Sequence, residues 1–377
     1  MRIGIDARMY RKETGGIGRY TRGLINELAV IDKKNEYVVF LTGDDMKEWV
    51  QPAENFKAVK ADIIHYSLDE QRKFGKIIER EKLDLIHYTN FNHPIFSKTP
   101  FVVTIHDLIM SLYPVGRKQK NPIRKLAYDY IMKHAARSAR KVIVPSVASK
   151  EDVVRMLGAK PDDVVVTYEA VDSEYDGKTN EKIRKEILGQ YKIQEPYLLF
   201  ISQWRPHKGI IPLLEAYEIL KEQYEDEINL VIGGKQNVDF PEIIAKAEEV
   251  RKKVGGVVMT GFIPEEDLPA IYDGAMIYVL ASLYEGFCLT HLEAMAAGVP
   301  VATSNTSCMP EVLQDAAEYF DPRDPHNIAR VLDKLINNKN RRDELVQLGK
   351  EQVKKYSWRK MASETLRVYE EAVNLQK

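Results

Sequence analysis

Two glutamates, Glu285 and Glu293, stand eight positions apart in the stretch YEGFCLTHLEAMAAGVPVA, which covers residues 284–302. The stretch is typical of a loop that leads into a helix of small residues and then into a strand. An ionised carboxylate only accepts hydrogen bonds, and the neighbouring hydroxyls of a sugar are suitable donors. Thr290 and Glu293 also fit the capping box S/T-x-x-E, which predicts a structural role for Glu293 in the first helical turn. The pair therefore indicates either a grip on a polyhydroxylated ligand or ordinary surface and capping roles.

A second candidate site is the loop SQWRPHKGI at residues 202–210, where Arg205 and Lys208 lie three positions apart. A guanidinium binds two oxygens as a fork and an ammonium acts as a point charge, so the two suit a diphosphate. The alternative is a pair of solvated charges, with His207 between them as an incidental residue. Backbone N–H groups over Gly286–Leu289, at a helix start, would add donors for the same anion.

The first half of the chain contributes a histidine and a glycine loop. In VVTIHDL, His106 follows a β-branched run, where it can donate to a sugar hydroxyl or polarise a reacting group. A histidine bonded to a loop carbonyl is the alternative. In ETGGIGRY, Gly15, Gly16 and Gly18 open a predicted helix, where backbone N–H groups can approach phosphate. The spacing differs from G-x-G-x-x-G, so a tight turn between strand and helix also explains it.

A basic segment spans residues 117–141, with nine Lys or Arg residues and one acid, Asp129, for a local charge of 9 − 1 = +8. Four of its cations stand at its beginning: Arg117, Lys118, Arg124 and Lys125. An apolar stripe runs through it at helical spacing: Ile123, Leu126, Ala127, Tyr130, Ile131 and Ala135. The stripe favours a helix that packs on a sheet with a solvated basic face. The excess charge leaves a second interpretation open, a helix on an anionic membrane surface or against a phosphate-bearing acceptor.

These candidates all follow or flank short apolar runs that predict buried parallel strands. The runs cover residues 2–6, 37–42, 83–88, 101–106, 141–146 and 164–169 in the first half, and 197–202, 228–234, 257–261, 277–282 and 299–304 in the second. Amphipathic segments separate them, so the fold class is α/β with doubly wound sheets. Residues 172–195 are polar and predict the junction between two domains, with binding loops at the carboxyl ends of the strands.

Composition excludes several classes of protein. The chain has 377 residues, two cysteines and a formal net charge of −1, so nucleic acid is not expected as a partner. No signal-like or membrane-spanning apolar run occurs, and a cytoplasmic location is expected. Two cysteines without a neighbouring Cys/His set also make a structural metal site an unfavoured interpretation.

In this order, the motifs resemble the family 4 retaining glycosyltransferases with the GT-B fold, and the resemblance covers nearly the whole chain. Its strongest part is E-x7-E with the residues around it: Glu285, Gly286, Phe287, Leu289, Glu293, Ala294, Gly298 and Pro300. The resemblance implies two Rossmann-like domains that face each other across a cleft. It assigns residues 1–172 to the acceptor side and 173–357 to the nucleotide-sugar donor, with a C-terminal helix of about 358–377 packed back on the first domain.

The resemblance also implies roles for the candidate residues. The catalytic set would be His106, Glu285, Arg205 and Lys208. The donor-binding set would be Gly15, Gly16, Gly261, Phe262, Gly286, Phe287, Cys288, Leu289 and Glu293. In this scheme Glu293 binds the ribose and Glu285 a hydroxyl of the donor sugar, while backbone near Gly261 meets the nucleobase. The charge pattern of the basic segment, independently of the resemblance, indicates an acceptor or membrane surface that includes Arg117, Lys118, Arg124 and Lys125.

The expected reaction is hexose transfer from a GDP- or UDP-sugar to a saccharide or lipid-linked acceptor, with retention by front-face attack. The chain contains no D-x-D triplet, so no metal and no separate cofactor is expected, and Arg205 and Lys208 would balance the diphosphate. The opening MRIGIDARMY and TGGIGRY are similar to mannosyltransferases of bacterial surface polysaccharide assembly, which indicates GDP-mannose. The alternatives are a nucleotide-sugar epimerase, a sugar phosphorylase, or a protein that binds nucleotide sugar without turnover.

Two departures from the family pattern stand out. Cys288 and Thr290 replace the second glycine and the proline of the usual E-G-F-G-L-P, which adds a side chain near the expected phosphate path. Glu169 and Ala170 replace the usual Asn-Gly before the interdomain Val-Asp, a change expected to affect the hinge more than the chemistry.

Overall fold

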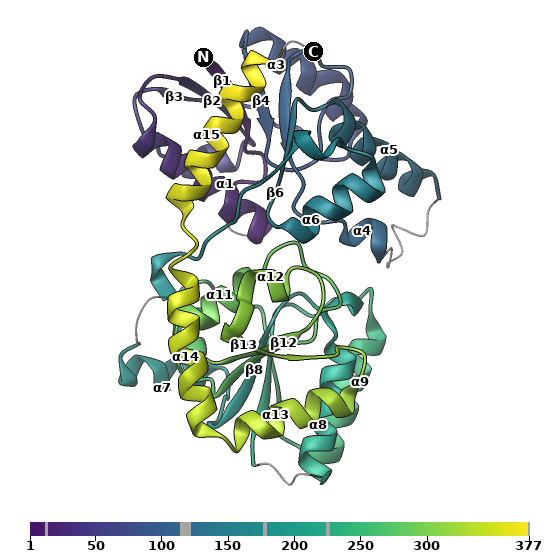
Figure 1. Cartoon of the computed structure of the whole chain (residues 1–377), viewed down its shortest axis with the longest axis vertical. Coiled ribbons are helices and arrows are strands. Elements are labelled where there is room, and N and C mark those ends of the chain that lie inside the picture. Colours follow the sequence, from purple (N-terminus) through teal and green to yellow (C-terminus); the bar gives the residue numbers. More distant parts are fainter. Residues whose placement is uncertain (12–13, 114–121, 176–178, 224–226, 376–377) are drawn as a thin grey trace. The chain divides into compact units, whose positions relative to one another are not determined.

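The computed structural model describes residues 1–11, 14–113, 122–175, 179–223 and 227–375 (Figure 1). The chain forms two compact units. The first unit consists of residues 1–111, 118–169 and 356–377, and the second of residues 112–117 and 170–355. The chain passes from the first unit to the second between Glu169 and Ala170, shortly before the boundary that the sequence predicts after residue 172.

The first unit is a seven-stranded parallel sheet with the order β3-β2-β1-β4-β5-β6-β7. Its strands are β1 (Arg2–Asp6), β2 (Glu36–Leu41), β3 (Phe56–Lys60), β4 (Leu85–Tyr88), β5 (Phe101–Thr104), β6 (Lys141–Val144) and β7 (Val164–Val166). The helices of this part of the chain are α1 (Gly16–Ile31), α2 (Asp45–Glu48), α3 (Gly75–Arg80), α4 (Ile109–Leu112), α5 (Pro122–Ser138), α6 (Val147–Asp152) and α15 (Trp358–Asn374). Strand order reverses between β1 and β4, which makes that pair the switch point of the sheet.

The second unit is a six-stranded parallel sheet with the order β10-β9-β8-β11-β12-β13. Its strands are β8 (Tyr197–Ile201), β9 (Asn229–Gly233), β10 (Val257–Gly261), β11 (Ile277–Leu280), β12 (Val301–Ser304) and β13 (Ala317–Phe320). Its helices are α7 (Glu181–Gln190), α8 (Ile210–Gln223), α9 (Pro241–Val254), α10 (Leu268–Asp273), α11 (Leu289–Ala296), α12 (Met309–Leu313), α13 (Pro325–Ile336) and α14 (Lys339–Val353). Here β8 and β11 form the switch point.

The continuous apolar runs of the sequence do form parallel strands with helices over them, because both faces of such a sheet are buried. In β1, Ile3 and Ile5 are fully buried, and so are Leu198 and Leu199 in β8. The sequence misses two strands, β3 and β13. Both lie at a sheet edge, where only one neighbour pairs and the apolar signal is weaker. Several strands also end earlier than predicted, so that His106 and Glu169 lie in loops beyond β5 and β7.

The C-terminal helix α15 packs on the first unit, alongside α1 (Figure 1). Met361 and Tyr369 of α15 join the same buried core as Leu24 of α1. A Cβ at Gly23 would lie 2.8 Å from the ring of Trp358, so the glycine allows close approach of the two helices. The helix thereby returns the end of the chain to the domain in which the chain begins.

Helix α5 differs from the predicted orientation. Its buried face consists of Met132, Ala135, Ala136 and the following Ala139. Leu126 and Tyr130, which the predicted stripe placed against the sheet, are 72% and 57% exposed. The stripe prediction is therefore wrong at its N-terminal end, because helical periodicity alone does not decide which of two overlapping apolar faces meets the sheet.

Candidate active site

The two strongest motifs of the sequence meet at the switch point of the second sheet. The loop with Arg205 and Lys208 follows β8, and the loop with Glu285 follows β11, the neighbouring strand. Gly209 has a φ of 67°, and a Cβ there would lie 1.9 Å from the carbonyl oxygen of Ala281. Only glycine permits both the left-handed backbone and this close approach of the two loops.

Lys208 and Glu285 form a direct ion pair. The Lys208 ammonium donates to Oε1 of Glu285 at 2.6 Å and to Oε2 at 2.8 Å. The Ser282 hydroxyl donates to the same Oε1 at 2.6 Å, and the Leu283 amide donates to the carbonyl of His207 at 2.7 Å. Side-chain and backbone hydrogen bonds thus link the two loops, and the carbonyl of His207 accepts one of them.

This ion pair retains hydrogen-bonding capacity. An ammonium has three N–H donors and a carboxylate has about four lone-pair positions, so neither group is saturated by the bonds between them. The side chains of Lys208 and Glu285 are 16% and 10% exposed. A ligand with a negatively charged group and a hydroxyl could therefore reach both partners, which is the arrangement that a sugar phosphate presents.

Ser307 holds the main chain of Glu285. Its hydroxyl donates to the carbonyl of Glu285 at 2.7 Å, and its φ of 54° places it in the left-handed region. Nothing in the sequence around Ser307 indicated this role, because the serine is far from the E-x7-E motif along the chain. Ser282 and Ser307 are thus two supporting residues that sequence reasoning missed.

Cys288 immediately precedes α11, and its side chain is directed into the protein. Its Sγ lies 3.4 Å from Sγ of Cys308, and both thiols are buried. Burial raises the pKa of the Cys288 thiol well above its ordinary value, so the sulfur stays protonated. The side chain of Cys288 therefore lies inside the protein beside Cys308.

Glu293 lies in the second turn of α11, and the capping-box prediction is wrong. The helix begins at Leu289 after Cys288, without a side-chain cap. Thr290 is inside the helix, where its hydroxyl accepts from Tyr278 at 2.8 Å. The carboxylate of Glu293 instead accepts from the Tyr272 hydroxyl at 2.9 Å. Tyr272 is a further supporting residue that the sequence did not indicate.

Apart from Gly15, Gly16 and His106, the remaining predicted catalytic and donor-binding residues lie in the same unit. Arg205 is half-buried directly before the short helical turn Pro206–Lys208 and takes no part in the Lys208–Glu285 pair. Gly261 ends β10 with a φ of 74°, and the side chain of Phe262 after it is exposed. Gly286, Phe287 and Leu289 lie between Glu285 and Glu293, at the start of α11.

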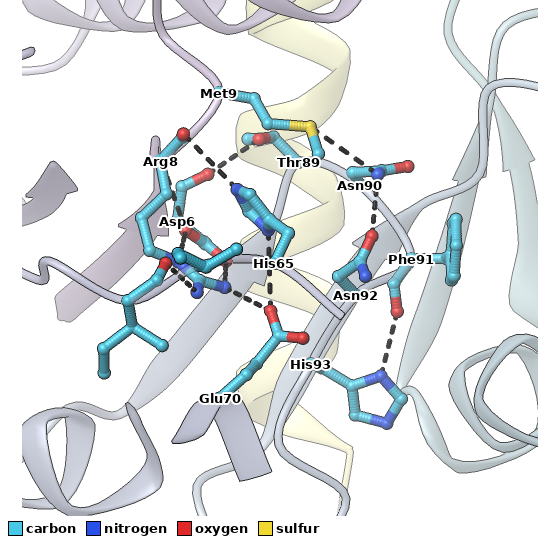
Figure 2. A network of polar contacts seen from close by, with 12 residues as sticks. Asp6, Arg8, Met9, His65, Glu70, Thr89, Asn90, Phe91, Asn92 and His93 are labelled. Carbon is cyan, nitrogen blue, oxygen red and sulfur yellow. Dashed lines mark hydrogen bonds and ion pairs between the residues drawn. The ribbon is translucent and has the colours of Figure 1, made fainter. Parts of the chain in front are cut away.

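The switch point of the first sheet holds a different cluster (Figure 2). Arg8, just after β1, donates through Nε and Nη2 to the two carboxylate oxygens of Asp6 at 2.8 and 2.7 Å. Its Nη2 also donates to Glu70 at 2.8 Å, Nη1 donates to the carbonyl of Ile63, and the guanidinium stacks 3.8 Å from the Phe74 ring centroid. The side chain of Arg8 is completely buried. Sequence reasoning did not single out this cluster.

Loop residues after β4 surround this cluster. Figure 2 shows Thr89, which donates to the carbonyl of Asp6 at 2.7 Å, and Asn90, which donates to Asn92 at 2.9 Å. His65 lies 3.5 Å from Glu70 through Nδ1. The charges of Asp6, Arg8 and Glu70 are therefore paired with one another and buried, as in a structural network.

His106 lies two residues beyond β5 and has both ring nitrogens occupied. Nδ1 is 3.0 Å from Oε1 of Glu169, and Nε2 is 2.9 Å from the carbonyl oxygen of Thr89. Glu169 raises the pKa of His106 against the effect of burial. The departure at Glu169 was expected to affect the hinge more than the chemistry, yet its carboxylate contacts the predicted catalytic histidine.

Of the other predicted residues in this unit, Gly15 has a φ of 66° directly before α1, and Gly16 is the first residue of that helix. Both are exposed. Arg117 and Lys118 lie outside the described residues, and only the backbone of Arg124 is described. Lys125 is exposed on α5. None of the helices in the described part of the chain combines the length and apolar character needed to span a bilayer.

Two family models match the chain in series. Residues 14–175 match "Glycosyltransferase Family 4", and residues 183–352 match "Glycosyl transferases group 1". The first match contains the Gly15 loop, His106 and Glu169. The second contains Arg205, Lys208 and both glutamates of E-x7-E.

Individual proteins agree with the family models. The chain is 28% identical over 371 residues to the O-antigen chain mannosyltransferase B of Escherichia coli, which covers 94% of this chain and 95% of that protein. It is 27% identical over 285 residues to the MMP alpha-(1->4)-mannosyltransferase of Mycolicibacterium hassiacum, covering 73% of this chain and 66% of that protein. Among solved structures, HepE of Anabaena in complex with UDP and glucose matches with a TM-score of 0.76 at 16% identity, over 98% of this chain and 99% of that one.

Proposed function

Since the chain belongs to the family 4 glycosyltransferases of the GT-B fold, we propose that it transfers mannose from GDP-mannose to a saccharide or lipid-linked acceptor with retention of anomeric configuration. The observation that carries the proposal is the Lys208–Glu285 pair at the switch point of the second sheet, with capacity left on both partners. Two relatives named as mannosyltransferases support the choice of sugar.

The proposed mechanism follows from where charge develops. Cleavage of the sugar–phosphate bond leaves negative charge on the departing diphosphate. Lys208 and Arg205 would stabilise that charge, together with the positive end of the helix dipole at the start of α11. With these cations in place the reaction needs neither metal nor cofactor, so transfer is expected to persist in EDTA.

Glu285 would bind a donor-sugar hydroxyl and would not act as a nucleophile. Both of its oxygens already accept from Lys208, and Oε1 also accepts from Ser282, so its negative charge is heavily compensated. A compensated carboxylate is a poor nucleophile but still a hydrogen-bond acceptor. Glu293, held by Tyr272, would accept from the ribose hydroxyls, and the exposed ring of Phe262 would contact the base.

The acceptor side of the proposal includes a membrane surface. On α5, Leu126, Tyr130, Lys133 and Arg137 are all exposed and follow one another at helical spacing. An apolar end and a cationic end on one helix face suit the boundary layer of an anionic bilayer, where a lipid-linked acceptor would lie. A double variant Leu126→Ser and Tyr130→Ser should lose binding to vesicles of anionic phospholipid, whereas Ile183→Ser, an exposed apolar residue of the second unit, should keep it.

The donor can be identified by a panel of GDP-, UDP- and ADP-sugars, scored first by thermal shift and then by transfer. We expect GDP-mannose to raise the melting temperature and to be turned over. Stabilisation by another nucleotide sugar would replace the proposed donor. Stabilisation without turnover or with release of an epimerised donor would contradict the transferase assignment.

The site is tested by Glu285→Gln. The variant should reduce transfer by about 10²–10³-fold, since one charged interaction in the site is lost. Glu218→Gln is a matched control. Glu218, on α8, is another largely buried carboxylate of the second unit, and it pairs with Lys246 and Lys253. Transfer at the wild-type rate by a folded Glu285→Gln protein would refute the proposed role.

A further inference from the structure

Both ring nitrogens of His106 are engaged within the first unit, and this determines where its protons must be. The carbonyl oxygen of Thr89 has no proton to give, so Nε2 of His106 carries a hydrogen and donates at 2.9 Å. Nδ1 lies 3.0 Å from Oε1 of Glu169. A neutral His106 would then direct a lone pair from Nδ1 at an ionised carboxylate, which is repulsive. The contact therefore requires a shared proton, and an imidazolium paired with a carboxylate supplies it.

The surroundings of His106 favour the charged form of the ring. Burial lowers the pKa of His106, but the carboxylates of Glu169 and Asp107 and the Thr89 carbonyl outweigh it, so the pKa is raised. His87, on β4, is the other nearby histidine, and burial lowers its pKa to about 3, so it adds no competing positive charge near neutral pH. Tyr20 of α1 packs edge-on against His106 with ring centroids 4.9 Å apart, and burial raises its pKa, so it stays neutral.

We propose that Glu169 is a positioning residue of the transfer reaction, and that it holds His106 as a doubly protonated ring with both N–H groups in use. On this assignment His106 serves the reaction as a fixed positive charge, neither as a base nor as a free hydrogen-bond donor. The assignment rests on the proposed function, because it concerns what His106 offers to a donor that carries a diphosphate. It adds Glu169, which no motif had indicated as part of the site.

The place of Glu169 in the chain gives the pair a second consequence. Glu169 is the last residue of the first unit before the chain passes into the second unit at Ala170. The ion pair with His106 fixes the side chain of this residue inside the first unit. The charge of His106 and the start of the connection between the units are therefore coupled: loss of the proton from His106 releases Glu169.

The protonation state can be read without any activity. Histidine ring nitrogens are recorded by long-range ¹H–¹⁵N NMR across pH 5–9, and His106 is assigned by the signal that disappears in His106→Gln. We expect both nitrogens of His106 to be protonated at pH 7 in the wild-type protein. Glu169→Gln should lower the pKa of His106 by at least about one unit, and Glu169→Asp should restore much of it. A neutral His106 at pH 7 in the wild type would overturn the proposal.

Activity supplies the second readout. The wild-type kcat/KM for transfer should fall as pH rises through the pKa of His106, and Glu169→Gln should move that fall to lower pH. Glu174→Gln, an exposed carboxylate just beyond the connection, should leave the profile unchanged. An unchanged profile in Glu169→Gln would refute the positioning role.

The two readouts separate two failures. If no nucleotide sugar is turned over, the proposed function fails, while the NMR titration still decides whether Glu169 sets the charge of His106. If transfer occurs and the titration of His106 does not respond to Glu169→Gln, the function stands and the inference fails. Should His106→Gln not fold, selective ¹⁵N labelling with Glu169→Gln alone identifies the signal that shifts.

Discussion

The two parallel sheets place charged side chains at equivalent positions, their switch points, yet the two charge clusters differ in saturation. In the first unit, Arg8 is completely buried and bonds Asp6, Glu70 and a backbone carbonyl. In the second unit, Lys208 is 16% exposed and bonds one carboxylate. The switch point of an open α/β sheet is where ligands usually bind. The Lys208–Glu285 pair presents a partly exposed cation and carboxylate there, whereas the Arg8 guanidinium is buried among its partners.

This difference shows that a charge pair at a switch point does not by itself indicate a binding site. A buried guanidinium that is bonded to all its neighbouring acceptors stabilises the fold, and its removal leaves carboxylates without a counter-charge. An ammonium bonded to a single carboxylate, such as that of Lys208, is held in one conformation and still has an N–H donor for a ligand. Variants at the two switch points should therefore differ in whether they lose stability or activity.

Arg8→Met should produce the largest loss of stability. It leaves Asp6 and Glu70 buried without their cation, and breaking a buried ion pair in this way costs about 3–5 kcal/mol of unfolding free energy. Urea unfolding measures the loss. Arg2→Met is the matched control, because Arg2 also pairs with two carboxylates but at the surface, where about 0–1 kcal/mol is expected. Equal losses in the two variants would contradict a structural role for the Arg8 cluster.

Lys208→Ala should have its main effect on activity. The loss of one positive charge facing the diphosphate should lower kcat/KM about 10²–10³-fold, and the loss of stability should be smaller than in Arg8→Met. Lys246→Ala is the control, since Lys246 is 20% exposed and pairs with Glu218 and Glu249 on the flank of the same unit. A Lys208→Ala protein with unimpaired transfer, or one as unstable as Arg8→Met, would remove the contrast between the two switch points.

The sequence predicted the second cluster far better than the first. Arg205, Lys208 and Glu285 belong to short motifs in loops after apolar runs, and adjacent parallel strands bring such loops together. The alternation of strands and helices likewise predicted both sheets and missed only the edge strands β3 and β13. Glu70 and Arg8, by contrast, are joined across a long stretch of chain, and no local pattern relates them.

Two local predictions failed for physical reasons, and one contact was not anticipated. The capping box at Thr290 matched in sequence, but α11 starts at Leu289, and tertiary hydrogen bonds from Tyr278 and Tyr272 take both side chains. The apolar stripe of α5 was wrong at its N-terminal end: Leu126 and Tyr130 are exposed, and Met132, Ala135 and Ala136 form the buried face. The contact between Glu169 and His106 was not anticipated, because the two residues are 63 positions apart in the sequence.

The stability of the first unit should depend on pH through the His106–Glu169 pair. The raised pKa of His106 means that the His106–Glu169 pair contributes its full stabilisation below the ordinary histidine value of 6.5 and loses it as pH rises through the raised value. The difference in unfolding free energy between the wild type and Glu169→Gln should therefore shrink as pH rises from 6 to 9. A difference that grows over this range would contradict an imidazolium at His106.

The smallest expected effects come from single hydroxyls, one at each switch point. Thr89→Val removes the bond to the carbonyl of Asp6, and Tyr272→Phe removes the bond to Glu293. Each should cost roughly 1 kcal/mol of unfolding free energy per buried hydrogen bond lost, and Thr89→Val also removes the acceptor of the Thr21 hydroxyl. Only Tyr272→Phe should also weaken nucleotide-sugar binding, by several-fold in a titration followed by calorimetry, since Glu293 would lose the group that orients it. If Thr89→Val weakened donor binding as much as Tyr272→Phe does, the first switch point would be part of the donor site, and the distinction between a saturated and an unsaturated cluster would have to be abandoned.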